Sequence, residues 1–114
     1  MGFIKKLVHV LSIFCYILII IYGIVWLPSV FGLKPLVVLS GSMEPTIKTG
    51  SILYYKSVPQ HEIIKDDIIT YRVNNSVVSH RVNAIIDGKY ETKGDANSNA
   101  DAAKIEYKDI LGRI

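Results

Sequence analysis

Two hydroxyl groups that could carry out chemistry lie close together in the turn at residues 39–46, LSGSMEPT. These are the side chains of Ser40 and Ser42. Pro45 fixes its own φ and disfavours a helical conformation at the residue before it, so we expect the chain to turn at the serines. Gly41 lets the backbone pass close to a bound molecule. Taken alone, however, Ser-Gly-Ser is most often an ordinary loop between strands.

A serine hydroxyl becomes a useful nucleophile only when a neighbouring base takes its proton, and a neutral imidazole can do this at physiological pH. His80, in a β-rich stretch, is the candidate base. A carboxylate would then hold the imidazole, and Asp95 and Asp101 are the two candidates. Taken alone, a strand histidine is usually a surface or core residue, and Asp95 could equally brace its own Gly-Asp-Ala-Asn turn.

The N-terminal part of the chain has the length and composition of a membrane-spanning helix. Residues 7–26, LVHVLSIFCYILIIIYGIVW, contain no Asp, Glu, Lys or Arg. As a helix they would cover about 30 Å, the thickness of a hydrocarbon core. We predict a transmembrane helix at 7–27 after a cytoplasmic n-region at 1–6. A cleaved signal peptide is the main alternative, but the apolar run is too long and no small-x-small cleavage site follows it.

Beyond Pro28 the pattern favours strands, and the predicted fold class is mainly β. We expect one antiparallel β module at 28–114, on the far side of the membrane from Lys5 and Lys6. Turns at 74–75 and 87–88 have residues that accept positive φ and predict hairpins. Strands are predicted at 36–39, 51–56, 68–73, 76–86, 89–93 and from 105 towards 114.

Charge and cysteine content exclude several classes of function. The 13 Lys and Arg residues against 10 Asp and Glu residues give a net charge of +3. Lys5 and Lys6 supply two of those charges, so the module is nearly neutral and lacks the basic face of a nucleic-acid-binding protein. Cys15 has no partner for an intrachain disulfide. No metal-ligand cluster or phosphate-binding glycine loop is visible, so we expect no metal and no cofactor.

The octapeptide at 39–46 closely resembles the nucleophile box of the type I signal peptidases. These are membrane-anchored serine endopeptidases that remove signal peptides from exported proteins. The resemblance implies that Ser42 is the nucleophile. It also implies that Ser40 lies at the oxyanion hole, where it would act together with the backbone N–H of Ser42.

Three further stretches resemble the endoplasmic-reticulum-type branch of that family, shared by archaea and some spore-forming bacteria. They are Ser-His-Arg-Val at 79–82, Lys-Gly-Asp-Ala-Asn at 93–97, and Asp101. In this branch a histidine replaces the lysine base of the common bacterial enzymes. The resemblance covers most of the chain from Val37 to Arg113. It implies that His80 is the general base and Asp101 the acid of the triad, with Asp95 in a supporting role.

The resemblance also implies a substrate, a site for it and a location. Secretory preproteins would bind in extended form along Val37, Val38 and Leu39, with Met43 beside them, and the family prefers small side chains one and three positions before the cut. The protein would sit in the cell membrane with a single crossing, or in the endoplasmic reticulum membrane if eukaryotic, with its catalytic module on the extracytoplasmic side. Its partners would be preproteins and the lipid bilayer, and the sequence identifies no accessory subunit.

Two other interpretations come from different classes of function. An inactive or truncated membrane-tethered β module could bind a partner, although an intact Ser, His and Asp set in the right order argues against it. A self-cleaving repressor-type peptidase also has a serine before Met, but it uses a lysine base and a DNA-binding domain, and neither is visible here. Members of the resembled branch commonly continue past the strand that contains Gly112, so a truncated or partial product is a further expectation for a chain that stops at Ile114.

Overall fold

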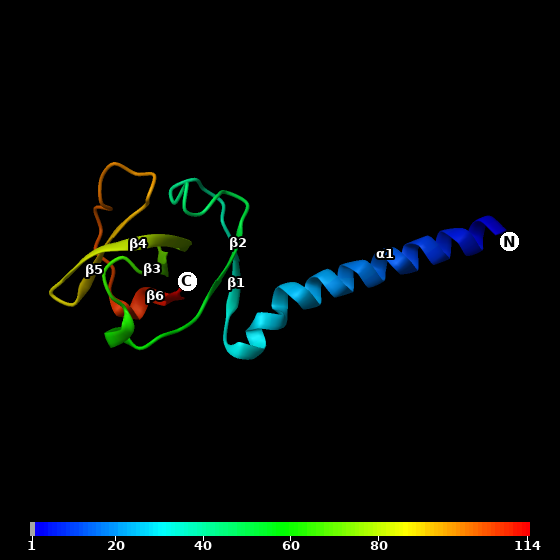
Figure 1. The fold of residues 1–114 in the computed structure, drawn as a ribbon, viewed down its shortest axis with the longest axis horizontal. Helices are drawn as coiled ribbons and strands as arrows, with labels where there is room; N and C mark the ends of the chain where they lie inside the picture. The colour runs from blue at the N-terminus through cyan, green and yellow to red at the C-terminus, as the bar shows by residue number, and fades with distance from the viewer. Residues whose placement is uncertain (1) are drawn as a thin grey trace.

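A long helix projects from a small β module, which gives the molecule extents of 71 × 29 × 24 Å (Figure 1). The computed structural model describes residues 2–114. The helix packs on the module only near its C-terminal end, through the connection to the first strand. The part of the chain that could carry out chemistry therefore lies in the module.

Helix α1 (Gly2–Trp26) has no buried residue, although its side chains are mostly apolar. Together with the turn that follows, it forms a 30-residue helical span, Gly2–Phe31, that is long and apolar enough to cross a membrane. The segment predicted at 7–27 lies inside this span. The helix begins earlier than predicted, because residues 2–6 of the expected n-region continue it, and residue 1 lies outside the described residues.

The helix ends where proline removes a backbone donor. Pro28 cannot donate a hydrogen bond to the preceding turn, and the chain tightens into the 3₁₀ helix η1 (Leu27–Phe31). Gly32 then adopts a left-handed conformation with φ of 82°, which favours glycine. The hydroxyl of Tyr54 donates a hydrogen bond of 2.8 Å to the carbonyl of Val25 and so ties the end of the helix to the module.

The module contains two antiparallel sheets, which confirms the predicted mainly β fold. The smaller sheet pairs two strands, and the larger has the strand order β5-β4-β3-β6. The strands are β1 (Lys34–Val37), β2 (Ile52–Tyr55), β3 (Ile68–Val73), β4 (Ser76–Ile86), β5 (Lys89–Lys93) and β6 (Ile110–Arg113). Two short 3₁₀ helices, η2 (Gln60–Glu62) and η3 (Tyr107–Asp109), lie in the connections.

The two predicted hairpins are confirmed. Asn74 and Asn75 have φ of 47° and 66° between β3 and β4, and Asp87 and Gly88 have φ of 51° and 76° between β4 and β5. Two-residue hairpins favour positive φ at both turn positions because that backbone twist matches the twist of the strands. The predicted bounds of β3, β4 and β5 agree with the structure.

The other predicted strands differ in their bounds from the structure. β1 begins and ends two residues earlier than predicted, and beyond Val38, which still hydrogen-bonds to Ser51, the Leu39 side chain is 87% exposed. β2 ends at Tyr55, and Lys56 forms only an isolated bridge to Arg113. Only the last part of 105–114 is a strand, since Ile105 bridges to Tyr90 and η3 intervenes before β6.

One apolar cluster lies against the four-stranded sheet. It consists of Ile63, Ile69, Tyr71, Val82, Tyr90 and Ile105. Ile69 and Val82 are fully buried in the neighbouring strands β3 and β4. Because β4 also contains His80, packing of the core fixes the position of the candidate base.

Candidate active site

Ser42 lies in the loop between β1 and β2, and the loop that contains Gly94 and Ala96 packs against it. The N–H of Ala96 donates to the carbonyl of Ser42 at 2.8 Å. A Cβ atom added to Gly94 would lie 2.5 Å from the same carbonyl oxygen, so only glycine allows this approach. The side chain of Met43, 2% exposed, packs under the turn. The serine is therefore held on a braced loop rather than on a free one.

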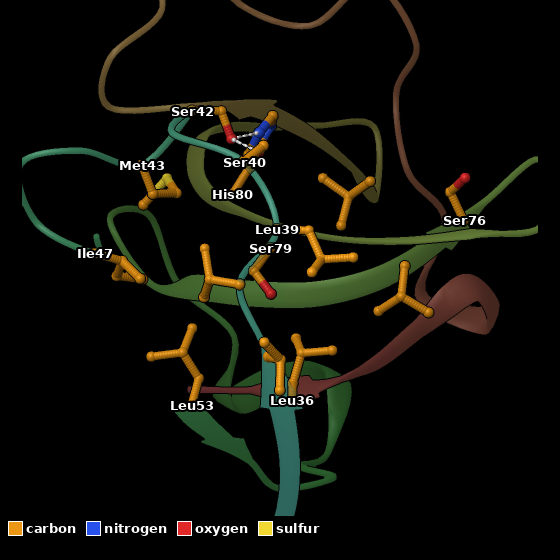
Figure 2. A pocket seen from close by; sticks show the side chains of 14 residues that line it. Leu36, Leu39, Ser40, Ser42, Met43, Ile47, Leu53, Ser76, Ser79 and His80 are labelled. Carbon is orange, nitrogen blue, oxygen red and sulfur yellow. Dashed lines mark hydrogen bonds between the residues drawn. The ribbon is translucent and has the colours of Figure 1, made fainter. Parts of the chain in front are cut away.

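His80 lies between Ser42 and Asp101. Its Nε2 atom is 2.9 Å from Oγ of Ser42 (Figure 2), and its Nδ1 atom is 2.6 Å from Oδ2 of Asp101. In the larger sheet it pairs with Ile69 of β3, and it is 8% exposed. One ring thus links a hydroxyl and a carboxylate that come from two different loops.

The chemistry of the partners fixes the tautomer of the ring. Burial by itself would raise the pKa of Asp101, but hydrogen bonds from His80, Thr92 and Tyr71 outweigh it and lower the pKa below the ordinary value. An ionised carboxylate only accepts hydrogen bonds, so Nδ1 of His80 must be the donor to it. In the neutral ring Nε2 then carries no proton and can accept one from the Ser42 hydroxyl.

Ser40 also lies at this point. Its Oγ atom is 3.3 Å from Oγ of Ser42, and Figure 2 shows both hydroxyls beside the ring of His80. Four of the residues predicted for the site, Ser40, Ser42, His80 and Asp101, therefore come together. Their catalytic roles stay predictions.

Asp95 lies outside this group. Its carboxylate accepts hydrogen bonds from Nε and Nη2 of Arg81 at 2.9 and 2.8 Å, and from the Thr46 hydroxyl at 2.6 Å. The hydrogen bonds from Arg81, acting against partial burial, and the one from Thr46 hold the pKa of Asp95 at about 2. The sequence left open that Asp95 braces its own turn by bonding its backbone. In the structure its carboxylate instead binds Arg81 of β4 and Thr46 of the serine loop.

An apolar groove of about 590 Å³ opens next to the serines. Val37, Val38, Leu39 and Met43, the residues predicted to contact substrate, all line it. Figure 2 labels Leu36, Leu53 and Ile47 along the groove, together with Ser76 and Ser79 of β4, which also line it. Among residues 2–114 no group of three His, Cys, Asp or Glu side chains is placed to hold a metal ion.

The sequence analysis missed three residues that shape the site. Thr92 and Tyr71 both contact Oδ2 of Asp101, at 2.8 and 3.4 Å, and Arg81 fixes the loop through Asp95. Two-residue alternation from Tyr90 would have placed Thr92 on the buried face of β5. It would not have indicated its partner, since Asp101 lies in an irregular segment.

Loss of the Asp95 carboxylate should lower stability in a pH-dependent way. The folded-state pKa of about 2 lies below the ordinary value of 3.8, so the pair stabilises the fold above about pH 4, and this contribution disappears as the pH falls towards 2. We expect Asp95→Asn to lower the free energy of unfolding by about 1–2 kcal/mol at pH 7, and by much less near pH 2.

Urea unfolding of the full chain in detergent micelles at several pH values measures this difference. Asp87→Asn, at an exposed turn position with positive φ, is the matched control and should have little effect. A stability loss for Asp95→Asn that is the same at pH 7 and pH 2 would contradict the ion-pair explanation.

Comparison with known proteins places the chain in a family. No family model matches the sequence. It is 33% identical over 120 residues to signal peptidase I W of Bacillus subtilis (strain 168). This alignment covers 93% of this chain and 63% of that protein. It is also 33% identical over 91 residues to the signal peptidase complex catalytic subunit SEC11C of Homo sapiens and of Mus musculus, covering 68% of this chain and 47% of each relative.

The chain thus spans between about half and two thirds of the length of these relatives. Its similarity to signal peptidase I W runs through nearly the whole chain, and both relatives carry signal peptidase names. The chain belongs to the type I signal peptidase family, in the branch of signal peptidase I W and SEC11C.

Proposed function

We propose that this protein is a membrane-anchored serine endopeptidase that cleaves signal peptides from exported preproteins. The observation that carries the proposal is the continuous hydrogen-bonded series Ser42–His80–Asp101, with distances of 2.9 and 2.6 Å. This arrangement is suited to acyl transfer at a peptide bond. Membership in the signal peptidase family supports the proposed substrate class.

In the proposed reaction, Nε2 of His80 takes the proton of the Ser42 hydroxyl as the oxygen attacks the scissile carbonyl. The Asp101 carboxylate stabilises the imidazolium that results and keeps its orientation. The imidazolium then gives its proton to the leaving amine. In the second half of the reaction a water molecule loses a proton to His80 and hydrolyses the acyl-enzyme, which restores Ser42.

The negative charge that develops on the substrate carbonyl needs donors beside Ser42. We assign this role to the backbone N–H of Ser42 and the hydroxyl of Ser40. The 3.3 Å separation of the two serine hydroxyls supports the assignment, because a carbonyl attacked by Oγ of Ser42 would lie within reach of Ser40. Such a donor contributes about 3 kcal/mol to transition-state stabilisation.

The groove beside the serines would hold the substrate segment before the cut. Within residues 2–114, β1 pairs with β2 alone, so its other edge is available for an extended peptide. Backbone hydrogen bonds along that edge would give affinity, and the shallow apolar walls would select small side chains. Val37, Val38, Leu39 and Met43 are the residues assigned to this contact.

The N-terminal helix would anchor the module to the membrane that holds the preprotein. Lys5 and Lys6 favour a cytoplasmic N-terminus by the positive-inside rule, which puts the β module on the extracytoplasmic side. Anchoring confines enzyme and substrate to one surface and raises their effective concentration. In a eukaryotic cell the corresponding membrane would be the endoplasmic reticulum.

Replacement of the nucleophile should abolish processing without unfolding the module. We expect Ser42→Ala to reduce preprotein cleavage by at least about 10⁴-fold, because the Ser42 hydroxyl is the one hydrogen-bonded to Nε2 of His80. The assay incubates the full chain in lipid vesicles with a preprotein and sequences the new N-terminus. Ser98→Ala, in an exposed loop, is the control and should cleave normally. Undiminished cleavage by Ser42→Ala would remove the enzyme assignment and favour a binding module.

The rate should fall on the acidic side of neutrality. A protonated imidazole cannot accept the proton of Ser42, so the cleavage rate should drop about tenfold per pH unit once the ring is charged. His80→Lys should not restore activity, because the site that positions an imidazole against Asp101 does not position an amine. Cleavage measured from pH 5 to pH 8 tests both expectations, and a flat profile would argue against His80 as the base.

The two aspartates should differ in their effect on the rate. Asp101→Asn removes the charge that stabilises the imidazolium and fixes its tautomer, and should cost about 10³- to 10⁴-fold. Asp95→Asn only loosens the supporting loop and should cost about tenfold or less. Cleavage rates of both variants at pH 7 give the comparison, and the opposite ranking would reverse the assignment of the acid.

A further inference from the structure

Thr92 contacts Asp101 at two points. The backbone N–H of Asp101 donates to the Thr92 carbonyl at 2.8 Å, and the Thr92 hydroxyl donates to Oδ2 of Asp101, also at 2.8 Å. Thr92 is 0% exposed. Asp101 belongs to no helix or strand, so β5 supplies a fixed point for a residue whose own segment is irregular.

Proton counting gives a direction to the hydrogen bonds behind Asp101. The single proton of the Thr92 hydroxyl is given to the carboxylate, which leaves its oxygen free to accept. The Tyr71 hydroxyl lies 3.0 Å from that oxygen and 3.4 Å from Oδ2 of Asp101, and it has one proton to donate to either. Burial raises the pKa of Tyr71 to about 12, so its hydroxyl keeps its proton at neutral pH. Both hydroxyls therefore direct their protons towards Asp101, Thr92 directly and Tyr71 either directly or through Thr92.

The register of the larger sheet brings these side chains together. Tyr71 pairs with Val78, and Thr92 pairs with Val82, the two residues on either side of His80 on its face of β4. Paired residues of antiparallel strands point to the same face, so Tyr71, His80 and Thr92 lie on one face. The sheet thus presents a hydroxyl pair directly behind the carboxylate that holds the imidazole.

We propose that Thr92, backed by Tyr71, is a positioning residue that holds Oδ2 of Asp101 towards His80. This proposal rests on the proposed function only because it concerns the same site, formed by Ser42, His80 and Asp101. Oδ2 has two short donors, Nδ1 of His80 at 2.6 Å and the Thr92 hydroxyl at 2.8 Å, and these fix the plane of the carboxylate. Without the Thr92 hydroxyl, Oδ2 would keep the ring of His80 as its one short donor, and its charge would be less dispersed.

The consequence can be measured at His80. Less dispersed charge on Oδ2 attracts a proton on the ring more strongly, so the ring should become charged at a higher pH. The titratable groups that contact the ring are Tyr71 from β3 and Asp101 from the 94–104 segment. Arg81, the next residue of β4, points to the other face and is paired with Asp95.

The test is a ¹⁵N NMR titration of the full chain, labelled at histidine, in detergent micelles. His80→Gln identifies the signals of residue 80 among those of the three histidines. We expect Thr92→Val to move the midpoint of the ring titration up by about half a pH unit or more. Thr92→Ser keeps the hydroxyl and should restore the wild-type midpoint, and Tyr71→Phe should move it up by less.

Thr70→Val is the matched control. Thr70 is also 0% exposed and lies in the neighbouring strand, but its hydroxyl bonds to Ser79 at 2.8 Å and not to Asp101. A midpoint that is unchanged in Thr92→Val, or that moves equally in Thr70→Val, would overturn the proposal. If Thr92→Val does not fold, Thr92→Ser and Tyr71→Phe decide the question. A wild-type midpoint in Tyr71→Phe would count against the proposal, and so would a shifted midpoint in Thr92→Ser.

The same variants in the preprotein assay should show the acidic limb of the rate profile moved by the same amount. The titration needs no substrate, so the two proposals can fail separately. A chain that cleaves no preprotein but shows the Thr92-dependent midpoint would refute the proposed function and keep the positioning role. Normal cleavage by all variants with one common pH profile would refute the positioning role alone.

Discussion

The hydrogen bond between Nδ1 of His80 and Oδ2 of Asp101 is the interaction on which the rest of the site depends. At 2.6 Å it commits the only proton of the neutral ring to the carboxylate side. Nε2 is thereby left without a proton, 2.9 Å from the Ser42 hydroxyl. A ring in the other tautomer would present a donor to that hydroxyl and could not take its proton. The capacity for base chemistry therefore comes from the acid as much as from the imidazole.

Two neighbouring residues of β4 hold two aspartates of the same loop. His80 binds Asp101 on the face that carries the core, and Arg81 binds Asp95 on the other. After Asp95 the segment returns alongside β5, where Asp101 and Ile105 form backbone hydrogen bonds with Thr92 and Tyr90. On its way it supports the serine loop through the hydrogen bond from Ala96 to the carbonyl of Ser42. One strand thus sets both ends of a segment that has no regular structure of its own.

Prediction from the sequence was accurate where a local rule governs the backbone. The two-residue turns have residues that accept positive φ, and the strands beside them agree in their bounds with the structure. Prediction was inaccurate where the outcome depends on distant partners. Residues 105–114 read as one strand, but Ile105 pairs with Tyr90 while β6 pairs with β3, so the segment divides between two partners. β-propensity measures fit to a pleated surface and does not say which surface.

The sequence by itself determined the apolar N-terminal helix, the antiparallel class of the module and the candidate site residues, which were Ser42, His80 and the two acids Asp95 and Asp101. Composition, period and motif are local properties of the chain. Only the tertiary structure decided that Asp101 faces the imidazole while Asp95 pairs with Arg81. It also brought Thr92 and Tyr71 behind the acid. The physical reason is that a side chain's hydrogen-bond partner depends on strand register and loop path, and both are set by packing between residues far apart in the sequence.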